Sequence, residues 1–278
     1  MKEELEEALK SEQNLLKALV KWIVLSTLVG GVVGVIASGF AHVISIVTEF
    51  RIGHPLMVLG LPIGGMLVVY LYKLGGQAKN SGTNMVLDTV RTPRGEMPTV
   101  ITPLILVATT ITHMFGGSSG REGAALQFGA SVGSFLGRTL KLNESDRKII
   151  MLSGMSAAFA ALFGTPMAAA VFPMEVTSVG VMYYSALVPC VFSAFIGEYV
   201  SVLLKVRTLK IPYLIEEVPS FYSVNCLKAI LLAVLFAAAG ILFCVLLHES
   251  ADLFGKWFPN PYLRVAVGGI AVILLALI

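Results

Sequence analysis

The residues best suited to chemistry lie in a glycine-rich turn, HMFGGSSGREGAALQFGASVGSF, at positions 113–135. Arg121 and Glu122 stand side by side there, directly before a run of small, helix-forming residues. Glycines followed by such a run leave backbone N–H groups free at the start of a helix, where the helix dipole also favours negative charge. The stretch therefore predicts an anion site, with Gly120, Arg121 and Gly123 around it.

A nucleotide phosphate is one anion that such a turn can bind, but the spacing is wrong for it. The P-loop pattern requires a lysine followed by serine or threonine, and neither follows the glycines here. The dinucleotide pattern GxGxxG also fails, because the glycines at 117, 120 and 123 are spaced by three. Nucleotide binding is not expected.

Glu122 can itself occupy the anion site. When it is ionised it acts as a tethered anion against the N–H groups, and when it is protonated it loses that attraction and can swing away to admit a free ion. An ionisable residue within a membrane is costly and indicates a function. The alternative is a structural role, in which Glu122 pairs with Arg121 or caps the helix. His113, nearby, is kept as a further candidate.

Two other segments carry matching residues. KNSGTNMVLD, at 79–88, is a second polar turn that opens a helical segment, and Ser81, Thr83 and Asn84 beside Gly82 can donate hydrogen bonds to a small anion. A plain capped turn is the alternative for it. FGTPMAAAVFPMEV, at 163–176, reads as a pair of broken helices ending in Glu175, which we interpret as a structural acid.

The elements that must position these residues are membrane helices. Of the 278 residues, 56% are hydrophobic and only 13% are charged, about half the charged share of an average soluble domain. Apolar stretches long enough to span a bilayer recur along the chain. The sequence predicts an all-α polytopic protein with spans at 17–48, 55–74, 99–115, 147–163, 179–204, 221–248 and 262–278.

The segments at 122–140 and 166–175 are shorter and interrupted, which is typical of the discontinuous helices of transporters. Small residues cluster at 30–39, 153–170 and 237–240. Because small residues let helix backbones approach closely in lipid, these clusters are predicted packing faces.

The net charge of +3 does not indicate nucleic-acid binding, because the basic residues form no stripe. The positions of the basic residues indicate membrane topology instead. Residues 1–16 are predicted to form a cytoplasmic amphipathic helix. Lysines flank the first span at its start and the second at its end, so the amino terminus and 73–98 are expected in the cytoplasm. The turn that holds Arg51 is expected outside.

The second half begins to repeat the first, because HPLMVLGLPIGG at 54–65 and NPYLRVAVGG at 260–269 both place a Pro turn before paired glycines. This weak similarity favours an inverted repeat, with a first transmembrane repeat at 17–210 and the start of a second at 211–278. Since the second copy stops within an apolar segment, we expect a fragment or one part of a split chain.

No metal site or cofactor is expected. Cys190, Cys226 and Cys244 lie in or beside apolar runs without CxxC or Cys/His spacing, and the four histidines are scattered. Enzymatic activity is not expected either.

The GREG turn, GMSAAFAALFGTPMAAAVFPMEV at 154–176 and the NSGTN turn at 80–84 together resemble the CLC family of chloride channels and anion/proton antiporters. The resemblance runs in order from about residue 17 to the end. It implies a fold of broken, tilted helices in an inverted repeat, incomplete in its second copy. It also implies a likeness to bacterial members, so that the bacterial plasma membrane is the expected location, and a homodimer.

The resemblance implies roles residue by residue. Glu122 matches the gating glutamate, which blocks the outer end of the anion path and shuttles protons. Ser81 matches the serine that contacts the central anion, together with the backbone of Gly82 and Thr83. Glu175 matches the first of two adjacent acids at the end of the FxxEE stretch. The family's remaining anion contacts, a GxFxP helix start and a tyrosine, are expected beyond this sequence.

Three departures from the family pattern are informative. Val176 stands where antiporters of the chloride branch have their inner proton-transfer glutamate, GREGA replaces GREGP, and Asn84 takes a proline position. These changes resemble the fluoride-exporting branch, although that branch usually carries asparagine at the position of Ser81.

The sequence therefore predicts transport of a small inorganic anion, chloride in the first instance, by a CLC-type channel or anion/proton antiporter gated by Glu122. A fluoride/proton antiporter is the alternative within this class. A non-conducting membrane scaffold or fragment is the alternative from another class. The expected partners are the anion, protons and the lipid bilayer.

Overall fold

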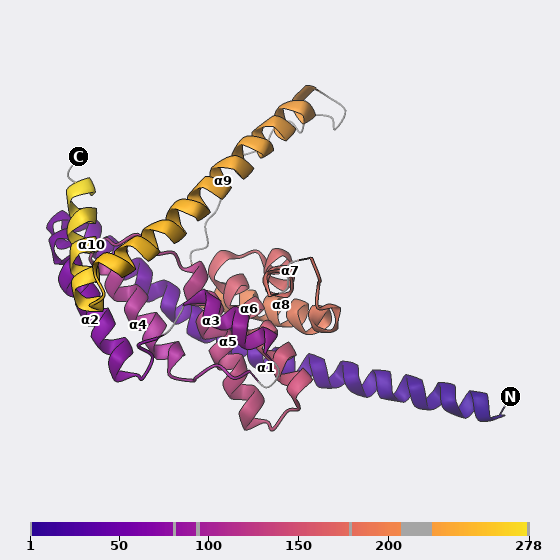
Figure 1. Ribbon diagram of the computed structural model, residues 1–278. Coiled ribbons are helices and arrows are strands. Elements are labelled where there is room, and N and C mark those ends of the chain that lie inside the picture. The colour runs from indigo at the N-terminus through magenta and orange to yellow at the C-terminus, as the bar shows by residue number, and fades with distance from the viewer. Residues whose placement is uncertain (1, 80–81, 93–94, 178–179, 207–223, 277–278) are drawn as a thin grey trace. The chain divides into compact units, whose positions relative to one another are not determined.

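The computed structural model describes residues 2–79, 82–92, 95–177, 180–206 and 224–276. Within these ranges the regular structure is helical and contains no strand (Figure 1). The predicted all-α class is confirmed. The helices are α1 (Lys2–Gly53), η1 (Pro55–Gly60), α2 (Leu61–Leu74), α3 (Thr83–Arg91), α4 (Ile101–Met114), α5 (Glu122–Thr139), α6 (Glu144–Phe163), α7 (Pro166–Val176), η2 (Tyr184–Ala186), α8 (Leu187–Leu203), α9 (Val224–Trp257) and α10 (Pro261–Ala276).

The chain divides into two compact units, Met1–Leu209 and Lys210–Ile278, called unit 1 and unit 2 below. Unit 1 contains every predicted site residue. Helices α5 and α6 lie at its centre, and most of their residues are buried. Phe128, Ile150, Leu152 and Met155 are among its most completely buried large side chains.

Glycines set the spacing between the central helices. A Cβ on Gly133 would lie 2.6 Å from the carbonyl oxygen of Ile150, and one on Gly129 would lie 2.6 Å from that of Gly154. Contacts this short leave no room for a side chain, so α5 and α6 pack backbone against backbone. The order of the contacts shows that the two helices run antiparallel.

The same device joins α8 to α6 and α1. A Cβ on Gly197 would lie 2.7 Å from the carbonyl oxygen of Ala157, and one on Gly34 would lie 3.1 Å from Cα of Gly197. The small-residue segments at 30–39 and 153–170 therefore act as packing faces, as predicted. The third segment, at 237–240, lies in unit 2, and its packing role stays a prediction.

Polar contacts fix the end of unit 1 at which α6 begins. The side chain of Asn143 caps α6 by accepting a hydrogen bond from the backbone N–H of Asp146, 2.8 Å away. Lys21 of α1 forms an ion pair with Asp146. Arg138 of α5 donates to the carbonyl of Met97 at 3.1 Å, which ties the segment before α4 to α5.

Several helices are short or broken, as the interrupted apolar segments predicted. Helix α3 has nine residues, and α7 has eleven with Pro166 near its start and Pro173 inside it. A proline within a helix removes one backbone hydrogen bond and disturbs the helix there. The predicted helix at 1–16 is not a separate element, because α1 continues through it without a break to Gly53.

Unit 2 repeats the order of elements at the start of unit 1. A long helix, α9, is followed by a short break and by α10, which begins at Pro261. In unit 1, α1 is likewise followed by a break and by a segment that begins at Pro55. The sequence similarity between 54–65 and 260–269 thus coincides with the same local architecture in both places.

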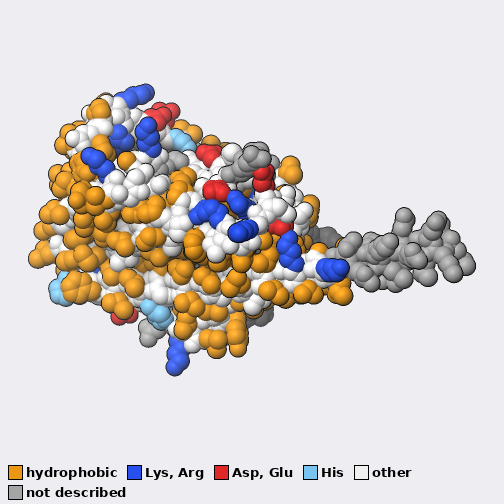
Figure 2. All heavy atoms as spheres, turned by 90° about the horizontal axis from the view of Figure 1, so that it is seen from below, with side chains coloured by type: hydrophobic (Ala, Val, Ile, Leu, Met, Phe, Trp, Pro, Cys, Tyr) orange, Lys and Arg blue, Asp and Glu red, His pale blue; other side chains and the backbone are white. Residues whose placement is uncertain are grey.

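Hydrophobic side chains cover most of the face seen in Figure 2, and the charged side chains gather in a few groups. Among the residues that the structure describes, four helical segments are long and apolar enough to cross a membrane: Leu15–Gly53, Pro55–Leu74, Tyr184–Leu203 and Val224–Trp257. Exposed apolar surface on this scale is costly in water. The chain is an integral membrane protein that crosses the bilayer several times.

Candidate anion site

Glu122 is the first residue of α5, and the short backbone turn before it ends at Arg121. Its carboxylate folds back over the turn, because Oε2 occupies the space that a side chain on Gly120 would need. A side chain at position 120 would displace this carboxylate from its place over the turn. The negative charge of Glu122 lies at the positive end of its own helix, as the sequence predicted.

Arg121 does not neutralise Glu122. Its guanidinium carbon lies 5.9 Å from the centroid of the Phe163 ring, in a cation–π contact at the end of α6. In the described parts of the chain, the Glu122 side chain has neither an ion pair nor a hydrogen bond. This geometry does not support the structural alternative, in which Glu122 pairs with Arg121 or caps α5.

The second polar turn meets the first. Gly82 precedes α3 with φ +66° and ψ −129°, a backbone conformation that other residues rarely adopt. Thr83 then begins the helix, and its hydroxyl oxygen lies 3.1 Å from the position that a Cβ on Gly123 would take. The starts of α3 and α5 are thus in contact, and Gly123 permits the approach. Two positive helix ends converge beside Glu122.

Aromatic rings line a pocket that Glu122 borders. This pocket, of about 320 Å³, is bounded by Glu122, Thr165, two alanines of α7 and the rings of Phe159, Phe163 and Phe172. The ring centroids of Phe159 and Phe172 are 4.8 Å apart. Sequence reasoning missed these rings and treated 153–170 only as a packing face. The spacing of Phe159 and Phe163, which places them on one side of α6, was the available signal.

The remaining predicted residues fall in three places. Asn84 is the second residue of α3 and is exposed. Glu175 is exposed at the far end of α7, next to Val176, whereas the start of α7 borders the pocket of Glu122. Ser81 lies outside the described residues. The structure therefore groups Gly82, Thr83, Gly120, Arg121, Glu122 and Gly123, and it leaves Glu175 apart.

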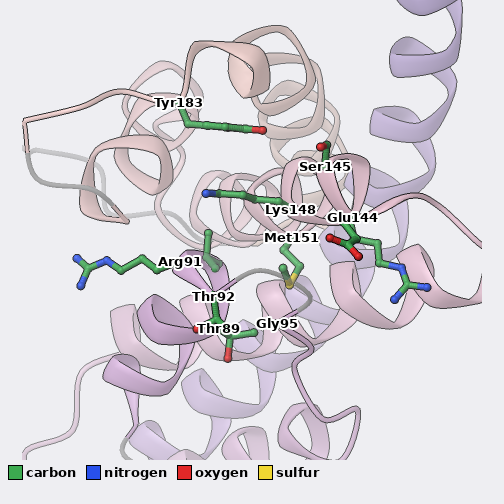
Figure 3. A pocket seen from close by; sticks show the side chains of 11 residues that line it. Thr89, Arg91, Thr92, Gly95, Glu144, Ser145, Lys148, Met151 and Tyr183 are labelled. Atoms are coloured by element: carbon green, nitrogen blue, oxygen red, sulfur yellow. The ribbon is translucent and has the colours of Figure 1, made fainter.

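Another pocket, of about 230 Å³, lies where α3 ends and α6 begins (Figure 3). Its cationic groups are engaged in contacts. The Nζ atom of Lys148 is 4.7 Å from the centroid of the Tyr183 ring, and Nε of Arg91 donates to the carbonyl of Thr177 at 2.6 Å. Arg147 pairs with Glu96 at 2.5 Å. These contacts tie the helix ends together, and we interpret this pocket as structural.

Comparison with known proteins identifies the family of this chain. The family described as voltage gated chloride channel matches residues 64–278, which is most of the chain. A chloride/fluoride channel protein of Pseudomonas syringae pv. tomato is 32% identical over 259 residues, which cover 93% of this chain. An uncharacterized protein of Methanocaldococcus jannaschii is 29% identical over 194 residues.

Two solved structures share the fold. A CLC-type fluoride/proton antiporter matches with a TM-score of 0.86 and 32% identity over 92% of this chain. A slow cyanobacterial Cl⁻/H⁺ antiporter matches with a TM-score of 0.70 and 18% identity over 91% of this chain. The second match supports the fold alone, because its sequence identity is low.

The chain spans 57% of the length of the Pseudomonas syringae protein and 65% of the fluoride/proton antiporter chain. The family match covers both units and includes the turns that begin α3 and α5. The chain belongs to the CLC family of voltage-gated chloride channels.

Proposed function

We propose that the chain forms part of a transporter that moves a small inorganic anion across the membrane, with Glu122 as a proton-operated gate. The observation that carries the proposal is the position of the Glu122 carboxylate, which lies without an ion-pair or hydrogen-bond partner among the described residues, at the meeting point of two helix starts. A carboxylate held in such a place competes with a free anion for the same positive ends.

The proposed mechanism has two states. Ionised Glu122 lies over the turn at Gly120 and excludes the anion by occupying the positive end of α5. Protonation removes its charge, so the side chain can move aside and a free anion can take its place. The backbone of Gly82 and Gly123 and the side chains of Ser81 and Thr83 are the proposed anion contacts. Release of the proton returns the carboxylate and expels the ion.

Chloride and fluoride are the two candidate ions, and two observations favour fluoride. The solved relative at 32% identity is described as a fluoride/proton antiporter, and the Pseudomonas syringae relative as a chloride/fluoride channel protein. Val176 and Asn84, which depart from the chloride branch, point in the same direction. We therefore propose proton-coupled fluoride movement as the more specific hypothesis and chloride movement as its alternative.

Transport rather than catalysis is the proposed activity, and a homodimer within the lipid bilayer is the proposed assembly. Glu175, apart from the helix starts, is assigned a structural role. It serves as a matched control for Glu122, because both are exposed glutamates of unit 1.

The experiment is anion efflux from liposomes that contain the complete protein, with an ion-selective electrode and a pH electrode recording together. We expect fluoride efflux accompanied by proton movement in the opposite direction. Chloride efflux of equal size would support the chloride alternative instead. Absence of both fluxes in a protein that is folded and inserted would support the non-conducting scaffold and reject the transporter.

A further inference from the structure

A polar pocket distinct from that of Glu122 lies at the end of unit 1 where α4 ends and α5 begins. It has a volume of about 790 Å³ and lies between α1, the end of α4, the turn before α5 and the residues that follow α8. Its ionisable lining residues are His42 and Glu49 of α1, His113 of α4, Arg121 before α5, and Lys205 after α8. In the predicted topology this end faces outside.

Two cations in this pocket lack an ionic partner. Among the described residues, Arg121, Lys205 and Glu49 take part in no ion pair, and the guanidinium of Arg121 lies against the ring of Phe163. The lining therefore carries two positive charges against one negative charge. Arg51, which does not line the pocket, lies beside the loop at Gly116, with a guanidinium nitrogen 3.6 Å from the position of a Cβ there. The balance of charge favours an anion as the occupant.

The hydrogen bonds of the two histidines determine which ring nitrogen can titrate. Nε2 of His42 lies 2.9 Å from the carbonyl oxygen of Leu204, and Nδ1 of His113 lies 2.9 Å from that of Thr109. A carbonyl oxygen only accepts, so these nitrogens carry the hydrogen in the neutral ring. The opposite nitrogens, Nδ1 of His42 and Nε2 of His113, are left to take up a proton.

A metal ion does not fit the same residues. Within the described residues, no group of three or more histidine, cysteine, aspartate or glutamate side chains is arranged to hold a metal. The pocket also contains two permanent cations, which repel a metal ion. Protonation of both histidines would add two more positive charges to a lining that is already positive.

We propose that this pocket binds a small inorganic anion and that binding is linked to protonation of His42 and His113. Arg121 and Lys205 attract the anion, and each protonated histidine adds a charge and a hydrogen-bond donor. Affinity for the anion therefore rises as the pH falls. By linkage, the bound anion makes both histidines easier to protonate. Glu122 does not line this pocket but borders a different one. Anion binding in this pocket does not depend on transport.

Histidine NMR on the complete protein in detergent micelles tests this proposal. Each imidazole is titrated in sodium chloride and in sodium gluconate at equal ionic strength, so that general screening is the same. The four histidines are assigned with single His→Asn variants. We expect chloride to raise the titration midpoints of His42 and His113, by up to about one pH unit for tenfold tighter binding to the protonated form.

The other two histidines are matched controls. In His54 and His248, Nδ1 lies 2.9 Å and 2.8 Å from the carbonyl oxygen four residues earlier, as in His113, but neither residue lines the pocket. Their midpoints should not change with chloride. An equal response of all four histidines, or of none, would reject the site.

A substitution localises the effect. Lys205→Gln removes one pocket cation outside the proposed gate, and it should reduce the chloride-dependent shift at His42 and His113. If the shift is unchanged in this variant, the anion binds elsewhere and the proposal is wrong. Because the measurement needs no transport, a protein inactive in liposomes can still confirm this site, and an active one can still lack it.

Discussion

Glu122 shows how the neighbours of a side chain decide which interactions it makes. Its carboxylate lies at the start of its own helix and beside the start of α3, and Arg121, next to it in sequence, turns to Phe163 instead. A glutamate beside an arginine normally suggests an ion pair. The absence of that pair in the described structure leaves the charge of Glu122 available for competition with a free anion.

Gly82 has a positive φ of 66°, a backbone conformation that favours glycine. Gly82→Ala places a Cβ at φ +66°, where the expected cost is about 1–3 kcal/mol although no atom obstructs the side chain. We expect a lower temperature of thermal unfolding in detergent and a weaker anion site. The matched control is Gly53→Ala, an open position at the end of α1, which should leave both properties unchanged.

If Gly82→Ala were as stable and as active as the unaltered protein, the turn before α3 would not require glycine. The proposed role of the helix start in positioning Ser81 and Thr83 would then lose its support.

The α5–α6 pair is the element that holds the site in place. These helices touch through glycines, so the position of Glu122 depends on how closely they pack. The Phe163 ring at the end of α6 contacts Arg121, and the rings of Phe159 and Phe163 border the pocket of Glu122. Changes deep in the helix pair should therefore reach the site.

Gly133→Leu tests this packing. The new side chain would collide with the carbonyl of Ile150, because a Cβ already comes within 2.6 Å of that oxygen. We expect destabilisation at or above the upper end of the usual range for overpacking, about 1–3 kcal/mol. Thermal unfolding in detergent is the measurement. Gly39→Leu, in the open on α1, is the control, and equal effects of the two substitutions would contradict the packing account.

Most helices could be predicted from the sequence, and the reasons lie in particular residues. Apolar length located the spans, and the prolines and glycines at 55–65 and 164–166 marked the breaks between helices. The extension of α1 through 1–16 was not predicted, because a surface helix and a continuing helix have the same charged, helix-favouring residues. The packing role given to 237–240 stays a prediction, since small residues favour close contact without specifying a partner.

At the site, the sequence located both helix starts because glycine, serine and threonine turns have a direct physical meaning. It could not determine that Thr83 and Gly123 touch, since that contact depends on how α3 and α5 pack. Nor could it exclude the ion pair between Arg121 and Glu122, which is decided by side-chain direction. The pocket of His42, His113, Arg121 and Lys205 combines residues from four elements and therefore lay beyond sequence reasoning.

At the scale of the whole molecule, the two units repeat one motif, a long helix followed by a break and a proline-initiated helix. The family match spans both units. Two helix starts converge in unit 1 beside one carboxylate. The proposed transport cycle requires that this carboxylate couple the movement of the anion to that of the proton.

Coupled flux in Glu122→Gln is the most direct measurement of this claim. The complete protein and the variants Glu122→Gln and Glu175→Gln are reconstituted in liposomes, and anion and proton movement are recorded together. Glutamine keeps the shape of protonated glutamate and cannot release a proton, so Glu122→Gln should lose proton movement, whether or not anion flux persists. Glu175→Gln should keep both. Proton coupling that survives unchanged in Glu122→Gln would contradict the account.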